Sequence, residues 1–270
     1  MDAWVDAIAS WLIALRAAGR PETTLALREY QLRRLAAAVA PAAPWEVTGA
    51  MLVAWVGGQA WQRNTLRSFR AAARGFYRWA HGMGLVEVDP ALALPSVRPP
   101  APNPHPTPED DYRLALARAD GRVRLMLRLA GELGLRRGEV ARARRDDLIR
   151  DLTGWSLMVH GKGGKVRYVP VPEGLAQVIR RHVEAGYLFP GRIDGHLSEH
   201  YVGKLVARTL PAAWSMHSLR HRFATMAHSV DRDLVTVQEL LGHASIETTR
   251  IYVLAPAERL RRTVEAVGAL

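Results

Sequence analysis

Residues 217–252 read HSLRHRFATMAHSVDRDLVTVQELLGHASIETTRIY, and the rest of the chain can be interpreted around this stretch. Helical patterns cover about 217–229 and 232–241, and the second pattern ends at Leu-Gly, where glycine is the common residue after a helix. The stretch places His217 and Arg220 one helical turn apart, His243 directly after the glycine, and Tyr252 further on. It therefore predicts two helices that bring together an arginine, two imidazoles and a phenol.

The composition is that of a basic globular protein. The chain has 270 residues, 49% of them hydrophobic, which is enough for two domains with ordinary cores. Its formal net charge of +11, spread over both halves, indicates a polyanionic partner. A membrane surface is the competing partner, but no apolar run of spanning length and no lipidation signal are visible. Without cysteine, disulfides and thiolate metal sites are excluded.

The first 94 residues are predicted to be helical. An amphipathic first helix with acidic residues near its start argues against a signal peptide and for a cytoplasmic protein. Further helices are expected from Pro21 to about residue 39, at about 48–60 and at about 64–80. On the last of these, arginines recur every three or four residues and form one stripe: Arg63, Arg67, Arg70, Arg74 and Arg78. A solvated basic face is the simpler interpretation, but the mutual repulsion of five arginines favours a helix that lies along DNA phosphates.

Residues 95–108, PSVRPPAPNPHPTP, contain seven of the sixteen prolines of the chain. Such a segment is extended and semi-rigid, and at polyproline spacing fourteen residues reach about 40 Å. This is the predicted linker between a helical domain at residues 1–94 and a second domain at residues 109–270.

The second domain is predicted to mix helices with a small antiparallel sheet, so the expected fold class is mainly α. Strand alternation occurs at 155–160 and 166–171, joined by Gly161-Lys162-Gly163-Gly164-Lys165. The other patterns are helical and are expected at about 109–119, 122–133, 173–185 and 198–209, with a turn into a further helix at 134–148.

Three common site types fit the residues poorly. His217 and His221 have the spacing of a zinc-binding helix, but Ser218 stands where the acid is expected and no third ligand is evident, so no metal is predicted. The lysine-containing turn lacks the phosphate-loop spacing and joins two strands. Paired aspartates such as Asp146-Asp147 lie at probable ends of elements, where acids are commonplace.

Metal-free cleavage of a phosphodiester fits better. The attacked phosphate gains negative charge on its equatorial oxygens, and planar, permanently charged arginines stabilise it. Lysine can protonate the leaving oxygen, and tyrosine has the lowest pKa of the hydroxyl side chains. The stretch at 217–252 together with the preceding arginines and lysines contains every group that this reaction needs.

The chain resembles the tyrosine recombinases, a family that includes the phage integrases. Four segments carry the resemblance, in the family's order: GLRRGE at 134–139, HGKGGKVRYVPV at 160–171, HSLRH at 217–221, and LGH at 241–243 followed by Tyr252. Residues 22–98 are similar to the family's helical core-binding domain.

The resemblance implies a role for each matching residue. Arg136 and Arg220 would clamp the scissile phosphate, Lys162 would protonate the leaving 5′ oxygen, and His217 would accept the tyrosine proton. His243 would hydrogen-bond a phosphate oxygen, and Tyr252 would form a 3′-phosphotyrosine bond. Glu139 is expected to support its own helix or Arg136, and Lys165 to contact a phosphate.

The implied partners are double-stranded core sites, a homotetramer on DNA, and a host or phage accessory factor, with no cofactor. The resemblance favours a compact integrase without an arm-type domain. Alternatives are a dimer resolvase of the Xer type, a type IB topoisomerase-like enzyme, and an inactive DNA-binding accessory factor. A helix in the tail at 256–270 is expected to dock on a neighbouring protomer or on its own domain.

Overall fold

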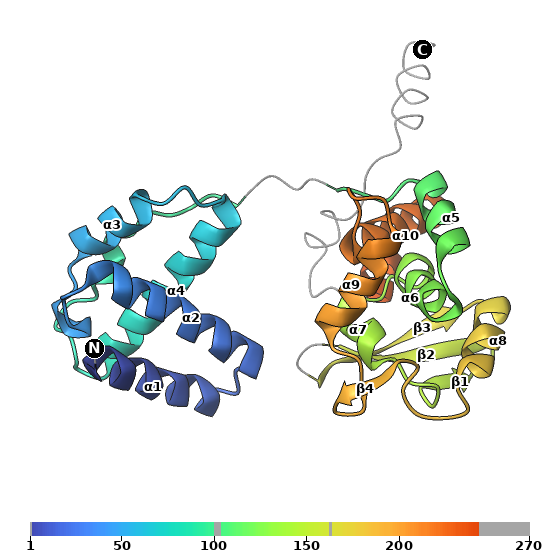
Figure 1. Ribbon diagram of the computed structural model, residues 1–270, viewed down its shortest axis with the longest axis horizontal. Helices are drawn as coiled ribbons and strands as arrows, with labels where there is room; N and C mark the ends of the chain where they lie inside the picture. Colours follow the sequence, from blue (N-terminus) through green and yellow to red (C-terminus); the bar gives the residue numbers. More distant parts are fainter. Residues whose placement is uncertain (1, 100–103, 162–163, 243–270) are drawn as a thin grey trace, which may run out of the picture. The chain divides into compact units, whose positions relative to one another are not determined.

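A computed structural model describes residues 2–99, 104–161 and 164–242. The chain divides into two compact units, residues 1–101 and 102–270, and the division falls inside the proline-rich segment (Figure 1). Lys162, His243 and Tyr252 lie outside the described residues, as does the tail at 256–270. Each unit is described below by itself.

The regular elements in the described part of unit 1 are all helices, as its hydrophobic pattern predicts. Its elements, blue to cyan in Figure 1, are α1 (Asp2–Ala17), α2 (Glu22–Val39), η1 (Pro44–Glu46), α3 (Gly49–Gly57), α4 (Arg63–Gly82) and η2 (Pro90–Ala93). Helix α2 begins directly after Pro21. Helix α3 begins after Thr48, whose hydroxyl accepts a hydrogen bond from the Met51 amide at 3.3 Å.

The core of unit 1 is built on the apolar face of α4. Phe76 is fully buried, and the rings of Trp4 and Trp45 stack on it at centroid distances of 5.9 and 5.8 Å. Tyr77 beside it donates its hydroxyl to the Pro44 carbonyl at 3.2 Å. Because α1 and η1 both pack on Phe76, one face of α4 is fixed inward and its arginines are left on the other faces.

Unit 2 combines helices with a small sheet. Its elements are α5 (Glu109–Arg118), α6 (Gly121–Glu132), α7 (Arg137–Arg142), β1 (Leu148–Arg150), β2 (Trp155–His160), β3 (Val166–Val171), α8 (Glu173–His182), β4 (Pro190–Ile193), α9 (Glu199–Thr209), α10 (Met216–Asp231) and α11 (Leu234–Leu241). The sheet has the antiparallel order β1-β2-β3, with Leu157 opposite Val169. The mainly α class with a small antiparallel sheet is confirmed.

Two details of unit 2 differ from the sequence prediction. The helix expected after a turn within 134–148 is limited to α7, and the chain then reaches strand β1, which was not predicted. Only Leu148 of the three residues in β1 is buried, so this edge strand is too short to show an alternating pattern. Strand β4 was also missed, and it makes only isolated bridges to His196.

Helix α6 is the centre of unit 2. Leu125, Met126, Leu127 and Leu129 are all at most 1% exposed, so a broad face of α6 is covered by other elements, whereas Arg124 stays exposed. Helices α8, α9 and α10 pack against α6, and in Figure 1 the sheet lies below α6, α9 and α10, with α8 beside it. As a result, the first turns of α10 lie beside the turn that joins α6 to α7.

Candidate active site

The side chains of Arg136 and Arg220 meet at one backbone oxygen. Arg136 is the residue before α7, and Arg220 lies in the second turn of α10. Arg220 Nη2 donates to the Leu241 carbonyl at 2.6 Å, and Arg136 Nη1 approaches the same oxygen at 3.3 Å. Two guanidinium groups that are far apart in sequence therefore lie side by side at the C-terminal end of α11.

Arg220 is held rigidly because its guanidinium is buried. The residue is only 1% exposed, and Nη1 donates to the Gly134 carbonyl while Nη2 donates to Leu241. Desolvating a cation costs several kcal/mol unless partners compensate it. Here the compensation comes from these carbonyls, from the negative end of the α11 dipole, and from Glu139, whose Oε2 lies 3.9 Å from Arg220 Nη1.

Glu139 is the buried carboxylate that joins these arginines. Its oxygens accept hydrogen bonds from the Arg136 amide at 2.8 Å and from Arg136 Nη1 at 2.9 Å. Burial raises the pKa of Glu139, but the hydrogen bonds and charge of Arg167 and those of Arg136 outweigh burial and lower this pKa to about 2. The carboxylate therefore stays ionised and supports Arg136, as expected from the sequence.

Arg167 was not singled out in the sequence, although it completes this cluster. From strand β3 it donates Nη1 and Nη2 to the two oxygens of Glu139, each at 2.8 Å, and Nε to the Leu240 carbonyl at 2.9 Å. The strand pattern of the sequence could have identified Arg167. Arg167 shares a strand face with Val169 and Val171, which are both buried, and a cation on a core face needs a buried partner.

The charges of Arg136 and Arg220 act on the ring of His217. Burial, followed by the charges of Arg220 and Arg136, lowers the pKa of His217 below its ordinary value. The ring is therefore neutral at neutral pH and able to accept a proton. The ring of His221, one turn later on α10, packs edge to face against it at a centroid distance of 4.6 Å.

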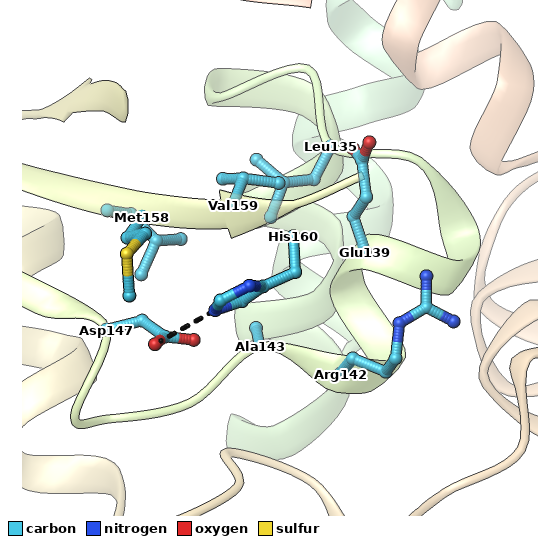
Figure 2. Close-up of a pocket in the computed structure, with 9 residues that line it drawn as sticks. Leu135, Glu139, Arg142, Ala143, Asp147, Met158, Val159 and His160 are labelled. Carbon is cyan, nitrogen blue, oxygen red and sulfur yellow. Dashed lines mark hydrogen bonds and ion pairs between the residues drawn. The ribbon is translucent and has the colours of Figure 1, made fainter. Parts of the chain in front are cut away.

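A small pocket lies at the base of the hairpin between β2 and β3 (Figure 2). This hairpin carries Lys162 and Lys165 and is here called the lysine hairpin. Figure 2 shows His160, the last residue of β2, pointing to Asp147, and His160 Nε2 lies 3.3 Å from Asp147 Oδ1. The hairpin is closed where the Gly161 amide donates to the Lys165 carbonyl at 2.7 Å. Lys165 itself is exposed. The structure thus describes both ends of the hairpin that carries Lys162.

The arginine stripe belongs to unit 1 and follows α4. Arg63, Arg67 and Arg78 are exposed, whereas Arg70 and Arg74 are half-buried. Arg70 Nη2 donates to the Leu94 carbonyl at 3.3 Å, so this arginine also holds the end of η2. Within the described ranges, none of the five forms an ion pair with a carboxylate. Their charge is available to a polyanion, and their DNA contact stays a prediction.

Of the six residues predicted to be catalytic, the structure describes three, Arg136, His217 and Arg220, and brings them into one neighbourhood. Lys162, His243 and Tyr252 lie outside the described residues. Leu241 and Gly242 are the last described residues, so the cluster holds the chain immediately before His243. Across the part of the chain that the structure describes, no helix is long and apolar enough to span a membrane.

Comparisons with known proteins place the chain among recombinases and integrases. Residues 108–259 match the family model described as "Phage integrase family". The tyrosine recombinase XerC of Methylobacterium sp. (strain 4-46) is 33% identical, over 97% of this chain and 92% of that protein. The solved integrase from mycobacterium phage Brujita is 26% identical over 93% of this chain and 88% of its own, with a TM-score of 0.50. A lambda integrase tetramer bound to a Holliday junction shares the fold at a TM-score of 0.76, with 17% identity over 94% of this chain and 77% of its own.

Proposed function

Because the chain belongs to the phage integrase family of tyrosine recombinases, enzymes that bind DNA and cut and rejoin it, we propose that its active site comprises Arg136, Lys162, His217, Arg220, His243 and Tyr252. The observation that carries this proposal is the shared acceptor of Arg136 and Arg220, the Leu241 carbonyl. This shared contact supports an active site in which both guanidinium groups lie beside the segment that leads to His243 and Tyr252.

In the proposed reaction, these residues account for each proton that is transferred and for the bond that forms to the phosphate. The Tyr252 oxygen attacks the phosphorus, its proton passes to neutral His217, and the bond from phosphorus to the 5′ oxygen breaks. Lys162 gives a proton to the leaving 5′ oxygen, while Arg136, Arg220 and His243 stabilise the charge on the phosphate oxygens. The 3′-phosphotyrosine bond keeps the energy of the broken bond, so rejoining runs by the reverse steps.

Unit 1 has the properties of a domain that holds the duplex. We assign residues 1–94 to core-site binding, 95–108 to a linker and 109–270 to catalysis. The arginine stripe of α4 supports this assignment, since its exposed members add uncompensated charge to a chain of net charge +11. Lys165, exposed at the base of the lysine hairpin, is assigned to a phosphate contact.

The biological use that the relatives favour is resolution of dimers by recombination at two short core sites, as in the Xer type. A relative called XerC is 33% identical over nearly the full length of both chains. Integration and excision of a phage genome is the second candidate, and the 26% identical phage integrase favours it. Either use implies a homotetramer on DNA in the bacterial cytoplasm, with accessory factors that set its direction.

A nicked suicide duplex that carries the target site tests the chemistry. We expect a covalent protein–DNA adduct through a 3′ phosphate that forms in the presence of EDTA and is absent from Tyr252→Phe. Tyr168→Phe is the matched control, because Tyr168 is an exposed tyrosine of β3 and should leave the adduct intact. An adduct in Tyr252→Phe, or none with the wild type on a verified site, would overturn the proposed active site.

The two biological uses are distinguished by their substrates. A Xer-type enzyme resolves a supercoiled plasmid that carries two copies of one short site from the host chromosome. An integrase instead joins two non-identical sites, one from the phage and one from the host. Recombination of the second pair alone would assign the chain to integration.

A further inference from the structure

The end of the inter-unit linker is hydrogen-bonded to the helix that carries His217. The Thr107 amide donates to the Ser218 carbonyl at 3.2 Å, and the Thr107 hydroxyl donates to the Ser218 hydroxyl at 2.9 Å. Two residues earlier, the His105 amide donates to Nδ1 of His221 at 3.2 Å. Residues 104–107, here called the strap, are thus joined to the first two turns of α10.

These contacts are buried, although the segment is rich in proline. Thr107, Ser218 and His221 are 3%, 5% and 4% exposed. The Ser218 hydroxyl donates its own proton to the Ser215 carbonyl at 2.7 Å and accepts from the Ser215 amide at 2.8 Å. Polar groups are buried in this way only where their hydrogen bonds are satisfied, so the strap is part of the structure around the start of α10.

The strap also fixes the chemical state of His221. Because Nδ1 accepts the His105 amide, the His221 ring must be neutral, with its proton on Nε2. Burial, followed by the charges of His217, His105 and Arg220, lowers the pKa of His221 to about 4. Among the described residues, the charged groups that act on neighbouring His217 are Arg220 on the same helix and Arg136 directly before α7.

We propose that His221 is a positioning residue through which the linker orients His217. The strap holds the His221 ring at Nδ1, and this ring packs edge to face against His217 with centroids 4.6 Å apart. A change in the path of the linker therefore changes the orientation and protonation of His217. The inference rests on the proposed role of His217 as the acceptor of the tyrosine proton.

Two substitutions of His105 distinguish the contribution of its backbone amide from that of its side chain. His105→Pro removes the amide proton in a segment that already has proline on both sides, and His105→Ala keeps the amide but removes the ring that packs on Trp214 at 4.4 Å. In full-length protein without DNA, NMR titration of His105→Pro should show the pKa of His221 raised by about one pH unit, because the bond that favours its neutral form is gone. Cleavage of the suicide duplex should fall about tenfold, with an altered pH profile, and His105→Ala should stay within about twofold of the wild type.

A second pair covers the case in which His105→Pro fails to fold. Thr107→Val is isosteric and removes only the hydroxyl bond to Ser218, whereas Thr107→Ser keeps that bond. Thr107→Val should likewise raise the pKa of His221 and alter the pH profile of cleavage, and Thr107→Ser should do neither. Unchanged histidine titrations in both His105→Pro and Thr107→Val would overturn the proposal, as would equal effects of proline and alanine at residue 105. If the wild type forms no adduct, the proposed function fails, and the titrations alone still decide the inference.

Discussion

Arg167 donates both of its terminal nitrogens to the two oxygens of Glu139, each at 2.8 Å, with the Glu139 side chain 2% exposed and that of Arg167 12% exposed. This pair joins strand β3, at the base of the lysine hairpin, to the first turn of α7. Because Arg167 Nε also reaches the Leu240 carbonyl, the same side chain fixes the end of α11. The pair therefore links three elements, α7, β3 and α11, which are next in the chain to Arg136, to the lysine hairpin and to His243, respectively.

Removing the charge of Glu139 should destabilise unit 2. Glu139→Gln keeps the shape of the side chain but leaves Arg167 and buried Arg220 without their carboxylate. Breaking a buried ion pair in this way costs about 3–5 kcal/mol. We expect a loss of this size in the free energy of unfolding, measured by urea denaturation followed by circular dichroism.

The matched control for Glu139→Gln is Glu199→Gln in the same unit. Glu199 pairs with Arg142 at 3.0 Å, but both side chains are at least 39% exposed. Exposed pairs contribute about 0–1 kcal/mol, so the control should remain close to the wild type. Equal losses in the two variants would show that the ion pairs of Glu139 contribute no more to the free energy of unfolding than a surface pair does.

The stability of unit 2 should also depend on pH through Glu139. The pKa of this carboxyl in the folded protein, about 2, is below its ordinary value of 4.5, so the unfolded state binds the proton more readily. The stabilisation is fully present above pH 4.5 and is lost as the pH falls from there towards 2. It amounts to about 3 kcal/mol, because each tenfold difference in proton affinity corresponds to about 1.4 kcal/mol. Urea titrations between pH 5 and pH 2 should show this loss in the wild type and a flatter profile in Glu139→Gln.

Gly242 ends α11 in a left-handed conformation that favours glycine. Its φ is +62°, and a Cβ added there would lie 2.9 Å from Arg167 Cδ. Gly242→Ala should lower stability by about 1–2 kcal/mol through backbone strain, and should displace Arg167 from the Leu240 carbonyl. Adduct formation should fall with it, because His243 is the next residue along the chain.

Gly174→Ala provides the control for glycine replacement. Gly174 lies in the first turn of α8, and a Cβ there meets nothing within 4 Å. The substitution should raise stability by about 0.4–1 kcal/mol through the unfolded state and leave cleavage unchanged. Loss of cleavage in Gly174→Ala, or full cleavage in Gly242→Ala, would contradict the special role of Gly242.

The elements were largely predictable from the sequence because their patterns are local. Strands β2 and β3 have the bounds that alternation predicts, and α4 shows the expected separation of core and arginine faces. Strand β1 was not predictable, since a three-residue edge strand is defined by its pairing with β2 and not by its own pattern.

The site was only partly predictable, for a physical reason of the same kind. Arg136 and Arg220 could be chosen from their motifs, but their meeting at the Leu241 carbonyl depends on how α6, α10 and α11 pack. The bond from His105 to His221 joins residues 116 positions apart, and nothing in a proline-rich linker signals it. Local patterns identify side chains, whereas long-range packing decides which of them share partners.

The arginine stripe of unit 1 makes a prediction about salt. Each phosphate neutralised by a cation contributes about −0.9 to the slope of log K against log salt concentration. Arg67 is exposed and without a carboxylate partner among the described residues, so Arg67→Ala should reduce the magnitude of the slope by about 0.9 on a core-site duplex. Arg33→Ala is the control, because Arg33 is exposed on α2 but already pairs with Glu29 at 2.7 Å, and it should leave the slope unchanged. Fluorescence anisotropy over a salt series measures both slopes, and equal changes in the two variants would mean that the stripe of α4 does not lie along the phosphates.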